Sequence, residues 1–217
     1  MCKKSLLMML LFALLAPWAA NAQTTVEIGD GTTADYYTPI GTYYNYSITE
    51  QLYTAEEIGT AGTITSISFY YAYVAAMDFP ITVYMANVDA TDLSTGISLA
   101  EGDEVFDGTL SVTEAGWVTI DLDAPFAYDG TSNLLIGVNK GYCQWFSGST
   151  CLYTDTDVTM ARYTQNDNNA YDLSTVPGNA TSQRPNIQME ITTSTGPTCD
   201  RPENLAVVNI ETTRAFL

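Results

Sequence analysis

The stretch Trp117-Val118-Thr119-Ile120-Asp121-Leu122 decides the fold class, because aliphatic residues alternate along it with polar or aromatic ones. Successive side chains of a β-strand point to opposite faces, so such a strand places Val118, Ile120 and Leu122 on one apolar face. The same two-residue period occurs at residues 67–73, 81–85, 134–138 and 187–191. Strands with one apolar face pack face to face, and the segments between these strands are rich in turn residues. We therefore predict an all-β protein, an antiparallel β-sandwich of the jelly-roll type.

A single helical turn is predicted at Thr54-Ala55-Glu56-Glu57. In this capping box the Thr54 hydroxyl and the Glu57 carboxylate each accept a hydrogen bond from the other residue's backbone N–H. Gly59 follows and favours a left-handed stop. We expect a short corner between two strands here rather than a packed helix.

The first residues predict secretion. Lys3-Lys4 precedes an apolar run from Leu6 to Ala16, and Ala20-Asn21-Ala22 supplies the small residues that signal peptidase requires. The apolar run is far shorter than the ~20 residues that a membrane-spanning helix needs. The sequence therefore predicts a signal peptide over residues 1–22 and a secreted mature chain that is not inserted in a membrane.

The charge of the chain excludes several partners. It contains 7 Lys and Arg against 25 Asp and Glu. Two lysines leave with the predicted signal peptide, so five cations remain against 25 acids, a net charge of −20. A surface of this sign repels phosphate backbones and anionic lipid headgroups. We therefore expect neither nucleic acid nor a membrane surface as the partner.

The pattern of the chain changes near residue 193. Residues 23–193 hold the alternating strands, and residues 194–200 read as a polar linker. A strand-like pattern restarts at residues 201–217, a stretch too short to bury a core of its own. We expect it to be the truncated start of a second β domain.

Several stretches carry a resemblance when they are taken together. They are residues 25–32 (TVEIGDGT), 44–47 (YNYS), 51–59 (QLYTAEEIG), 62–69 (GTITSISF) and 125–134 (PFAYDGTSNL). With them, residues 24–193 resemble an exported adhesin-type module of Bacteroidetes surface proteins, and Pro202-Glu203-Asn204-Leu205 resembles the opening of a fibronectin type III domain. The resemblance implies attachment to the cell surface through later parts of the protein, and a role in adhesion. It supplies no catalytic or binding residue.

The residue types that are missing limit the chemistry. The chain has no histidine, which excludes Ser-His-Asp and Cys-His catalysis and histidine-based zinc sites. It also lacks a phosphate-binding Gly-Lys loop and a dinucleotide fingerprint. The remaining enzymatic alternative is a glycosidase, which needs only two positioned carboxylates. No pair of acids is marked for this role, so we predict that the chain is not an enzyme.

Closely spaced aspartates make calcium the candidate cofactor. Asp89 with Asp92, and Asp155 with Asp157, fall in or near predicted turns, where carboxylates and carbonyls can supply the 6–8 oxygens that Ca²⁺ takes. Aspartate is also common in turns because it accepts hydrogen bonds from its own backbone. Calcium binding and simple turn capping remain as alternatives at both pairs.

Aromatic residues supply the remaining functional signal. Five tyrosines lie within residues 36–46, and a second group surrounds two cysteines. That second group is Tyr142, Trp145, Phe146 and Tyr153. In an oxidising compartment Cys143 and Cys151 are near enough in sequence for a disulfide, which would hold Tyr142 and Trp145 rigid. Exposed rings of this kind stack on the apolar faces of sugars, whereas buried rings only fill the core.

We therefore predict a non-catalytic extracellular module that recognises glycans or host matrix proteins through residues 142–153. The alternative is a structural spacer or stalk that binds no ligand and presents later domains. Binding of the purified protein to glycans and matrix proteins distinguishes these two hypotheses.

Overall fold

The structure is a computed structural model that describes residues 21–73, 76–146 and 150–194. One compact unit spans Ala22–Ser194. The fibronectin-like start and all but the first residue of the predicted linker lie outside the described residues. So does the predicted signal peptide, apart from Asn21 and Ala22, which begin the first strand. Within the described ranges, no helix is long and apolar enough to cross a membrane.

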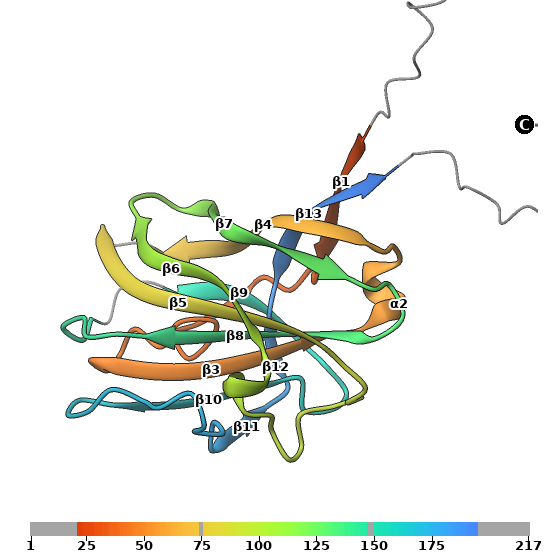
Figure 1. The fold of residues 1–217 in the computed structure, drawn as a ribbon. Coiled ribbons are helices and arrows are strands. Elements are labelled where there is room, and N and C mark those ends of the chain that lie inside the picture. Colours follow the sequence, from red (N-terminus) through yellow and green to blue (C-terminus); the bar gives the residue numbers. More distant parts are fainter. Residues whose placement is uncertain (1–20, 74–75, 147–149, 195–217) are drawn as a thin grey trace, which may run out of the picture. The chain divides into compact units, whose positions relative to one another are not determined.

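The fold is an all-β sandwich of two packed sheets, which confirms the predicted fold class (Figure 1). Among the described residues, sheet A contains β1 (Asn21–Ile28), β13 (Ile187–Ser194), β4 (Gly62–Tyr73), β9 (Thr150–Asp155) and β12 (Gln183–Pro185) in that order, with β2 (Thr33–Asp35) beside β9 and β7 (Gly116–Tyr128) beside β4. Sheet B contains, in order, β11 (Asn179–Thr181), β10 (Ala161–Asn166), β3 (Tyr46–Tyr53), β8 (Asn133–Lys140), β5 (Met77–Val88) and β6 (Asp103–Val112). The pairs that form the centre of each sheet, such as β4 with β7 and β3 with β8, are antiparallel.

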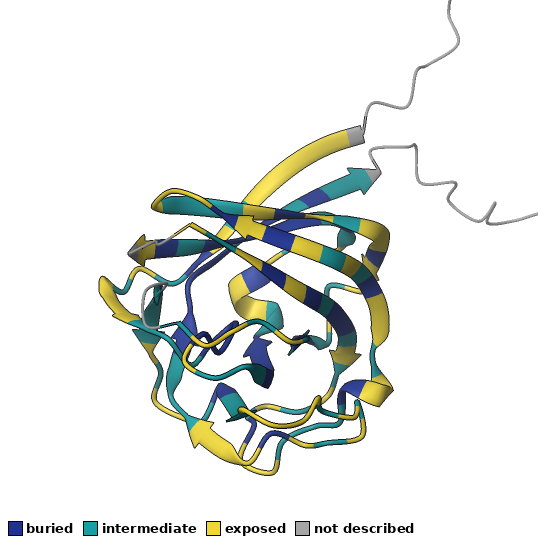
Figure 2. Cartoon of the chain, turned by 90° about the vertical axis from the view of Figure 1, so that its left-hand side faces the viewer, coloured by how far each residue is buried: buried dark blue, intermediate teal, exposed yellow. Residues whose placement is uncertain are grey.

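The apolar stripes of the sequence face one another between the two sheets. Ile67, Phe69 and Tyr71 of β4 are at most 1 % exposed, and Ile81 and Val83 of β5 at most 2 %. Figure 2 shows buried and exposed residues alternating along the upper strands. Because complete burial of a large apolar side chain contributes roughly 1.5–3 kcal/mol, these stripes provide the main stabilisation of the sandwich.

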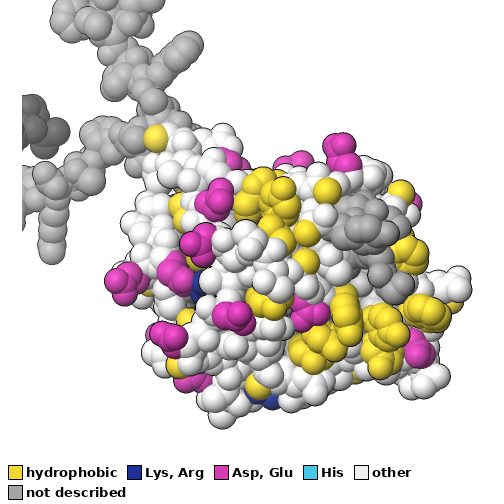
Figure 3. All heavy atoms as spheres, turned by 180° about the vertical axis from the view of Figure 1, so that it is seen from behind, with side chains coloured by type: hydrophobic (Ala, Val, Ile, Leu, Met, Phe, Trp, Pro, Cys, Tyr) yellow, Lys and Arg dark blue, Asp and Glu magenta, His cyan; other side chains and the backbone are white. Residues whose placement is uncertain are grey.

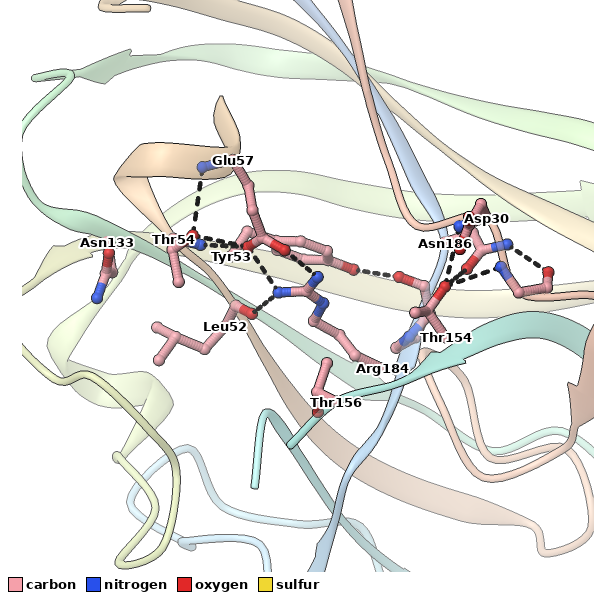
Figure 4. A network of polar contacts seen from close by, with 12 residues as sticks. Asp30, Leu52, Tyr53, Thr54, Glu57, Asn133, Thr154, Thr156, Arg184 and Asn186 are labelled. Carbon is pink, nitrogen blue, oxygen red and sulfur yellow. Dashed lines mark hydrogen bonds and ion pairs between the residues drawn. The ribbon is translucent and has the colours of Figure 1, made fainter. Parts of the chain in front are cut away.

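The predicted capping box is present. α2 (Ala55–Ile58) follows Thr54, whose hydroxyl accepts a hydrogen bond from the Glu57 N–H, while the Glu57 carboxylate accepts one from the Thr54 N–H at 2.9 Å. Gly59 ends the turn with a φ of 71°. The Glu57 carboxylate also binds Arg184 of β12, and Arg184 donates to the Leu52 carbonyl of β3 (Figure 4). The corner therefore connects the two sheets.

The centre of sheet B, at β3 and β8, is buried on both faces, which the alternating pattern does not predict. Every residue of β3 from Ser47 to Tyr53 is buried. Two long connections cover the outer face: residues 89–102 between β5 and β6, which include the short helix η1 (Leu99–Glu101), and residues 167–178 between β10 and β11. Leu93 packs there with Leu52 of β3, and Leu99 packs with Ile48. These connections form a third layer over the sandwich.

A buried carboxylate lies beneath this layer. Glu50 of β3 has an exposed fraction of 0 %, and one of its oxygens accepts a hydrogen bond from the Ile97 N–H at 2.9 Å. Its other oxygen lies 3.6 Å from Arg162 Nε and accepts no hydrogen bond. Burial raises the pKa of Glu50 to about 7, although the Ile97 N–H and the charge of Arg162 act in the opposite direction.

Replacing Glu50 with glutamine is expected to raise the free energy of unfolding at neutral pH and to make this free energy depend less on pH. The folded state holds a proton on Glu50 between pH 4.5 and 7 that the unfolded chain has released, so stability falls as pH rises through this window. The wild type should lose up to about 3 kcal/mol relative to Glu50→Gln across it. Urea unfolding of both proteins at pH 4.5 and 7.5 measures the difference, and parallel pH profiles would contradict the assignment.

Candidate binding surface

Aromatic rings from three separate segments form one continuous row. Tyr163 of β10 stacks on Tyr37 with ring centroids 4.4 Å apart, and Tyr37 contacts Tyr36 at 4.4 Å. Tyr36 contacts Tyr43 at 5.2 Å, and Tyr43 contacts Trp145 at 5.9 Å. We call these five residues the aromatic strip. Such centroid distances are those of favourable aromatic pairs, so each ring helps to fix the orientation of the next.

One end of the aromatic strip faces solvent. Tyr43 is 43 % exposed and Trp145 is 52 % exposed. Tyr142, which contacts Tyr46 at a centroid distance of 5.7 Å, is 60 % exposed. Figure 3 shows several groups of apolar side chains on the face seen from behind, including a broad one at the lower right. Contiguous exposed apolar groups of this kind mark interaction surfaces in soluble proteins.

Asn45 joins the two loops that carry the exposed rings. Its side-chain oxygen accepts a hydrogen bond from the Trp145 N–H at 2.8 Å, and its backbone carbonyl accepts one from the Cys143 N–H at 3.1 Å. A third bond runs from the Phe146 N–H to the Thr42 carbonyl at 2.8 Å. The backbone around Trp145 is therefore tied to residues 42–45 at three points.

Asp167 and Lys140 also hold these loops through hydrogen bonds. Asp167 accepts a hydrogen bond from the Asn45 N–H at 3.1 Å, and its backbone carbonyl accepts one from Asn45 Nδ2 at 3.0 Å. Lys140 at the end of β8 is 1 % exposed, and its ammonium donates to the Tyr44 carbonyl at 2.5 Å. Burial lowers the pKa of Lys140 to about 8, with Cys143 and Asp167 acting in the opposite direction. The loops are therefore held by a network and not only by ring contacts.

A carboxylate and several hydroxyls accompany the rings. Asp35 of β2 accepts a hydrogen bond from the Tyr36 N–H at 2.6 Å. Burial raises the pKa of Asp35, against the effect of the Tyr36 and Tyr37 N–H groups. The hydroxyls of Tyr36 and Tyr37 lie 3.1 Å apart, within hydrogen-bond distance. The pKa of Tyr163 is raised, mainly by burial and next by the negative charge of Asp35. The strip thus combines apolar ring faces with polar groups at their edges.

The four aromatic residues selected from the sequence have different positions in the structure. Trp145 belongs to the strip, Tyr142 lies exposed on the same loop, and Phe146 is half-buried. Tyr153 of β9 has no ring contact with another described residue of the kind that joins the strip, and its hydroxyl accepts a hydrogen bond from Gln183 Nε2 at 2.9 Å. Neither Tyr163 nor Asn45 was predicted. Tyr163 lies outside both aromatic groups of the sequence, and Asn45, although within residues 36–46, is not aromatic.

The predicted disulfide between Cys143 and Cys151 is absent from the structure, where both residues are free thiols. Cys151 lies in β9 opposite Tyr71 of β4, and burial raises the pKa of its thiol. Cys143 Sγ lies 3.6 Å from the backbone carbonyl of Asp78 in β5. Proximity in sequence alone does not bring the two side chains into disulfide geometry. Hydrogen bonds to Asn45, and not a disulfide, hold the loop that carries Cys143 and Trp145.

The aspartates considered for calcium do not gather in the structure. Asp92 accepts a hydrogen bond from the Ser94 N–H at 2.7 Å, which is the turn-capping alternative. Asp89 follows the end of β5, and Asp155 ends β9 opposite Gln183. Asp157 is exposed in the turn that follows β9. Within residues 21–73, 76–146 and 150–194, no three acidic or cysteine side chains are close enough to hold a metal ion.

A separate cleft of about 440 Å³ is rich in acidic residues. It is lined by Glu27, Gly29, Asp30, Glu57, Thr154 and Arg184 (Figure 4 draws four of them). Burial favours the protonated form of Glu57, but the hydrogen bonds from Arg184 and Thr54 prevail and lower its pKa to about 2. A glycosidase needs one carboxylic acid that stays protonated near neutral pH. Glu57 does not meet this requirement.

No protein-family model matches this chain, and no curated protein sequence is similar to it. The class of the protein therefore has to be defined by its own fold and surface. It is a β-sandwich in which aromatic side chains from the β2–β3 and β8–β9 connections meet at the surface.

Proposed function

We propose that this chain is a non-catalytic recognition module of a secreted surface protein, and that the aromatic strip binds glycans. One observation carries the proposal. Tyr43 and Trp145 come from loops that lie far apart in the sequence, yet their rings are in contact while 43 % and 52 % of the two residues remain exposed. A ring that served only the core would be covered by other side chains.

The chemistry of the strip suits sugars. A pyranose presents apolar C–H faces that stack on aromatic rings, and its hydroxyl groups need hydrogen-bond partners at the edge of those rings. Here the Tyr36 and Tyr37 hydroxyls and the Asp35 carboxylate supply such partners. The bonds from Asn45 hold the Trp145 loop in place before a ligand arrives, so little conformational entropy is lost on binding.

The rest of the sequence supports an extracellular setting. The N-terminal residues have the features of a secretory signal, and the net charge of −18 suits a soluble exported protein. The resemblance to Bacteroidetes surface modules and the fibronectin-like residues near the C-terminus favour an adhesive role in a larger protein. Glycoproteins of a host matrix are candidate partners because they display glycans.

A glycan and matrix-protein array, probed with the full chain, tests this proposal. We expect reproducible glycan binding by the wild type, loss of that binding in the double variant Tyr142→Ala/Trp145→Ala, and full binding by Val158→Ala. Val158 is a matched control because it is 48 % exposed and lies in the turn between β9 and β10, outside the strip. The same array run with calcium and with a chelator measures any contribution of the metal. A blank array with folded protein would reject glycan binding and favour the spacer hypothesis.

A further inference from the structure

The positive charges of the described residues are all directed inward. Residues 21–194 contain three cationic side chains, Lys140, Arg162 and Arg184. Lys140 is 1 % exposed, Arg184 is 3 % exposed, and the Arg162 side chain is 11 % exposed. In Figure 3, Asp and Glu side chains are spread over the visible face, whereas Lys and Arg reach it only in small areas.

Each of these cationic side chains already donates hydrogen bonds to groups inside the protein. Lys140 donates to the Tyr44 carbonyl at 2.5 Å. Arg162 donates to the carbonyls of Leu93, Ser94, Pro177 and Gly178 at distances between 2.6 and 3.1 Å. Arg184 binds both oxygens of Glu57 and lies 4.8 Å over the Tyr53 ring. None of the three is therefore available to an external anion without breaking contacts that hold the fold together.

The charged groups that the structure places at the aromatic strip are, in contrast, carboxylates. Twenty-two of the 25 Asp and Glu residues of the chain lie within residues 21–194. Asp35 contacts the strip through Tyr36, and Asp167 holds Asn45 below Trp145. A ligand that approaches the strip therefore meets a negative potential, and none of the three cationic side chains of the described residues is exposed to offset it.

We infer that the aromatic strip selects uncharged glycans and excludes acidic ones, such as chains that carry sialic acid, uronic acid or sulfate. This inference rests on the proposed glycan function and adds the chemical class of the ligand. Proteins bind carboxylate and sulfate groups with Arg or Lys, which supply charged donors and compensate for the lost hydration. The strip offers only rings, hydroxyls, amides and carboxylates, so an acidic sugar would lose hydration and gain repulsion.

A glycan array with matched pairs tests the inference. Each neutral backbone is printed with its sialylated, uronic acid-bearing or sulfated counterpart, and the full chain is applied in 50 mM and in 500 mM NaCl. These salt concentrations are chosen because the Debye length falls from roughly 14 Å to about 4 Å between them. We expect binding to neutral members to depend little on salt, and binding to acidic members to be at least about fivefold weaker at low salt and to recover at high salt.

The variant Gln144→Lys makes the test specific to the strip. Gln144 is exposed and directly precedes Trp145. A lysine there should raise binding to acidic members about threefold to fivefold at low salt and leave neutral members unchanged. Acidic members that bind the wild type as well as their neutral partners, through Trp145, would overturn the charge selection but leave the glycan function intact. Absence of binding to every member would overturn both.

Discussion

Arg184→Met is expected to lower the free energy of unfolding by about 2 kcal/mol, the largest loss of stability that we predict for a single side chain. The guanidinium binds both Glu57 oxygens and the Leu52 carbonyl at 3.0 Å, and it lies over the Tyr53 ring (Figure 4). Methionine fills most of the volume but leaves the Glu57 carboxylate and the Leu52 carbonyl without their main donor. The buried Leu52 carbonyl loses this donor, whereas water compensates in part for the Glu57 carboxylate, whose side chain is 33 % exposed.

Chemical denaturation of wild type, Arg184→Met, Glu57→Gln and the double variant measures this effect. The double variant should be less destabilised than the sum of the single variants, because both act on one ion pair. The pKa of Glu57 is lowered to about 2, so the pair stabilises the protein fully above pH 4.5 and loses this effect as pH falls toward 2. The difference between wild type and Arg184→Met should shrink over the same range. A difference that stays constant from pH 7 to pH 2.5 would show that the ion pair does not cause it.

The strands of this fold were predictable because their signals are local. The alternation in β4, β5, β7, β8 and β13 lies within each strand and places the same residues in the core that the structure buries. The capping box at Thr54 and Glu57 is equally local, since both partners lie within one turn. Such signals depend on periodicity and on neighbours at fixed spacing, which the sequence displays directly.

The third layer over sheet B was not predictable in this way. It depends on Leu93, Leu99 and Leu173, which lie in long connections without a regular period. Their contacts with β3 join residues far apart in the chain, and Glu50 is buried because these connections cover it. Glu50 lies on the same face of β3 as Ile48 and Leu52, so the strand by itself does not show what covers its carboxylate. Only the tertiary structure shows how this face is covered.

The candidate site was predictable in its parts but not in its assembly. The sequence shows two aromatic groups, within residues 36–46 and 142–153, without indicating that they meet. Asn45 joins the two groups through its hydrogen bonds with Cys143 and Trp145, and Tyr163 extends the row at its other end by stacking on Tyr37. A single asparagine in a loop and a single tyrosine in a strand carry no pattern that predicts these contacts. The disulfide prediction failed for a related reason, because a spacing of a few residues says nothing about the direction of the Cys151 side chain within β9.

Trp145→Ala is expected to weaken binding to the strongest array glycan at least about 30-fold, which corresponds to roughly 2 kcal/mol. The indole is the largest exposed ring of the strip, and its removal also takes away one of the rings that Tyr43 contacts. Trp145→Phe retains a stacking face and should lose only about threefold to fivefold. Isothermal titration of the three proteins, with Val158→Ala as the control, measures these differences. Equal affinities for wild type and Trp145→Ala would show that the strip is not the binding site.

The same titration can separate contact with the glycan from positioning of the loop. Asn45→Ala removes the acceptor of the Trp145 N–H and the bond to the Asp167 carbonyl, so we expect about tenfold weaker binding with a stability loss near 1 kcal/mol. If Asn45 acts by holding Trp145, its effect on affinity should nearly vanish in the Trp145→Ala background. Asn45→Asp keeps the acceptor for the Trp145 N–H and should retain more affinity than Asn45→Ala. If the losses of binding free energy are fully additive, Asn45 contacts the glycan itself. An independent contact contributes the same binding free energy whether or not the indole is present.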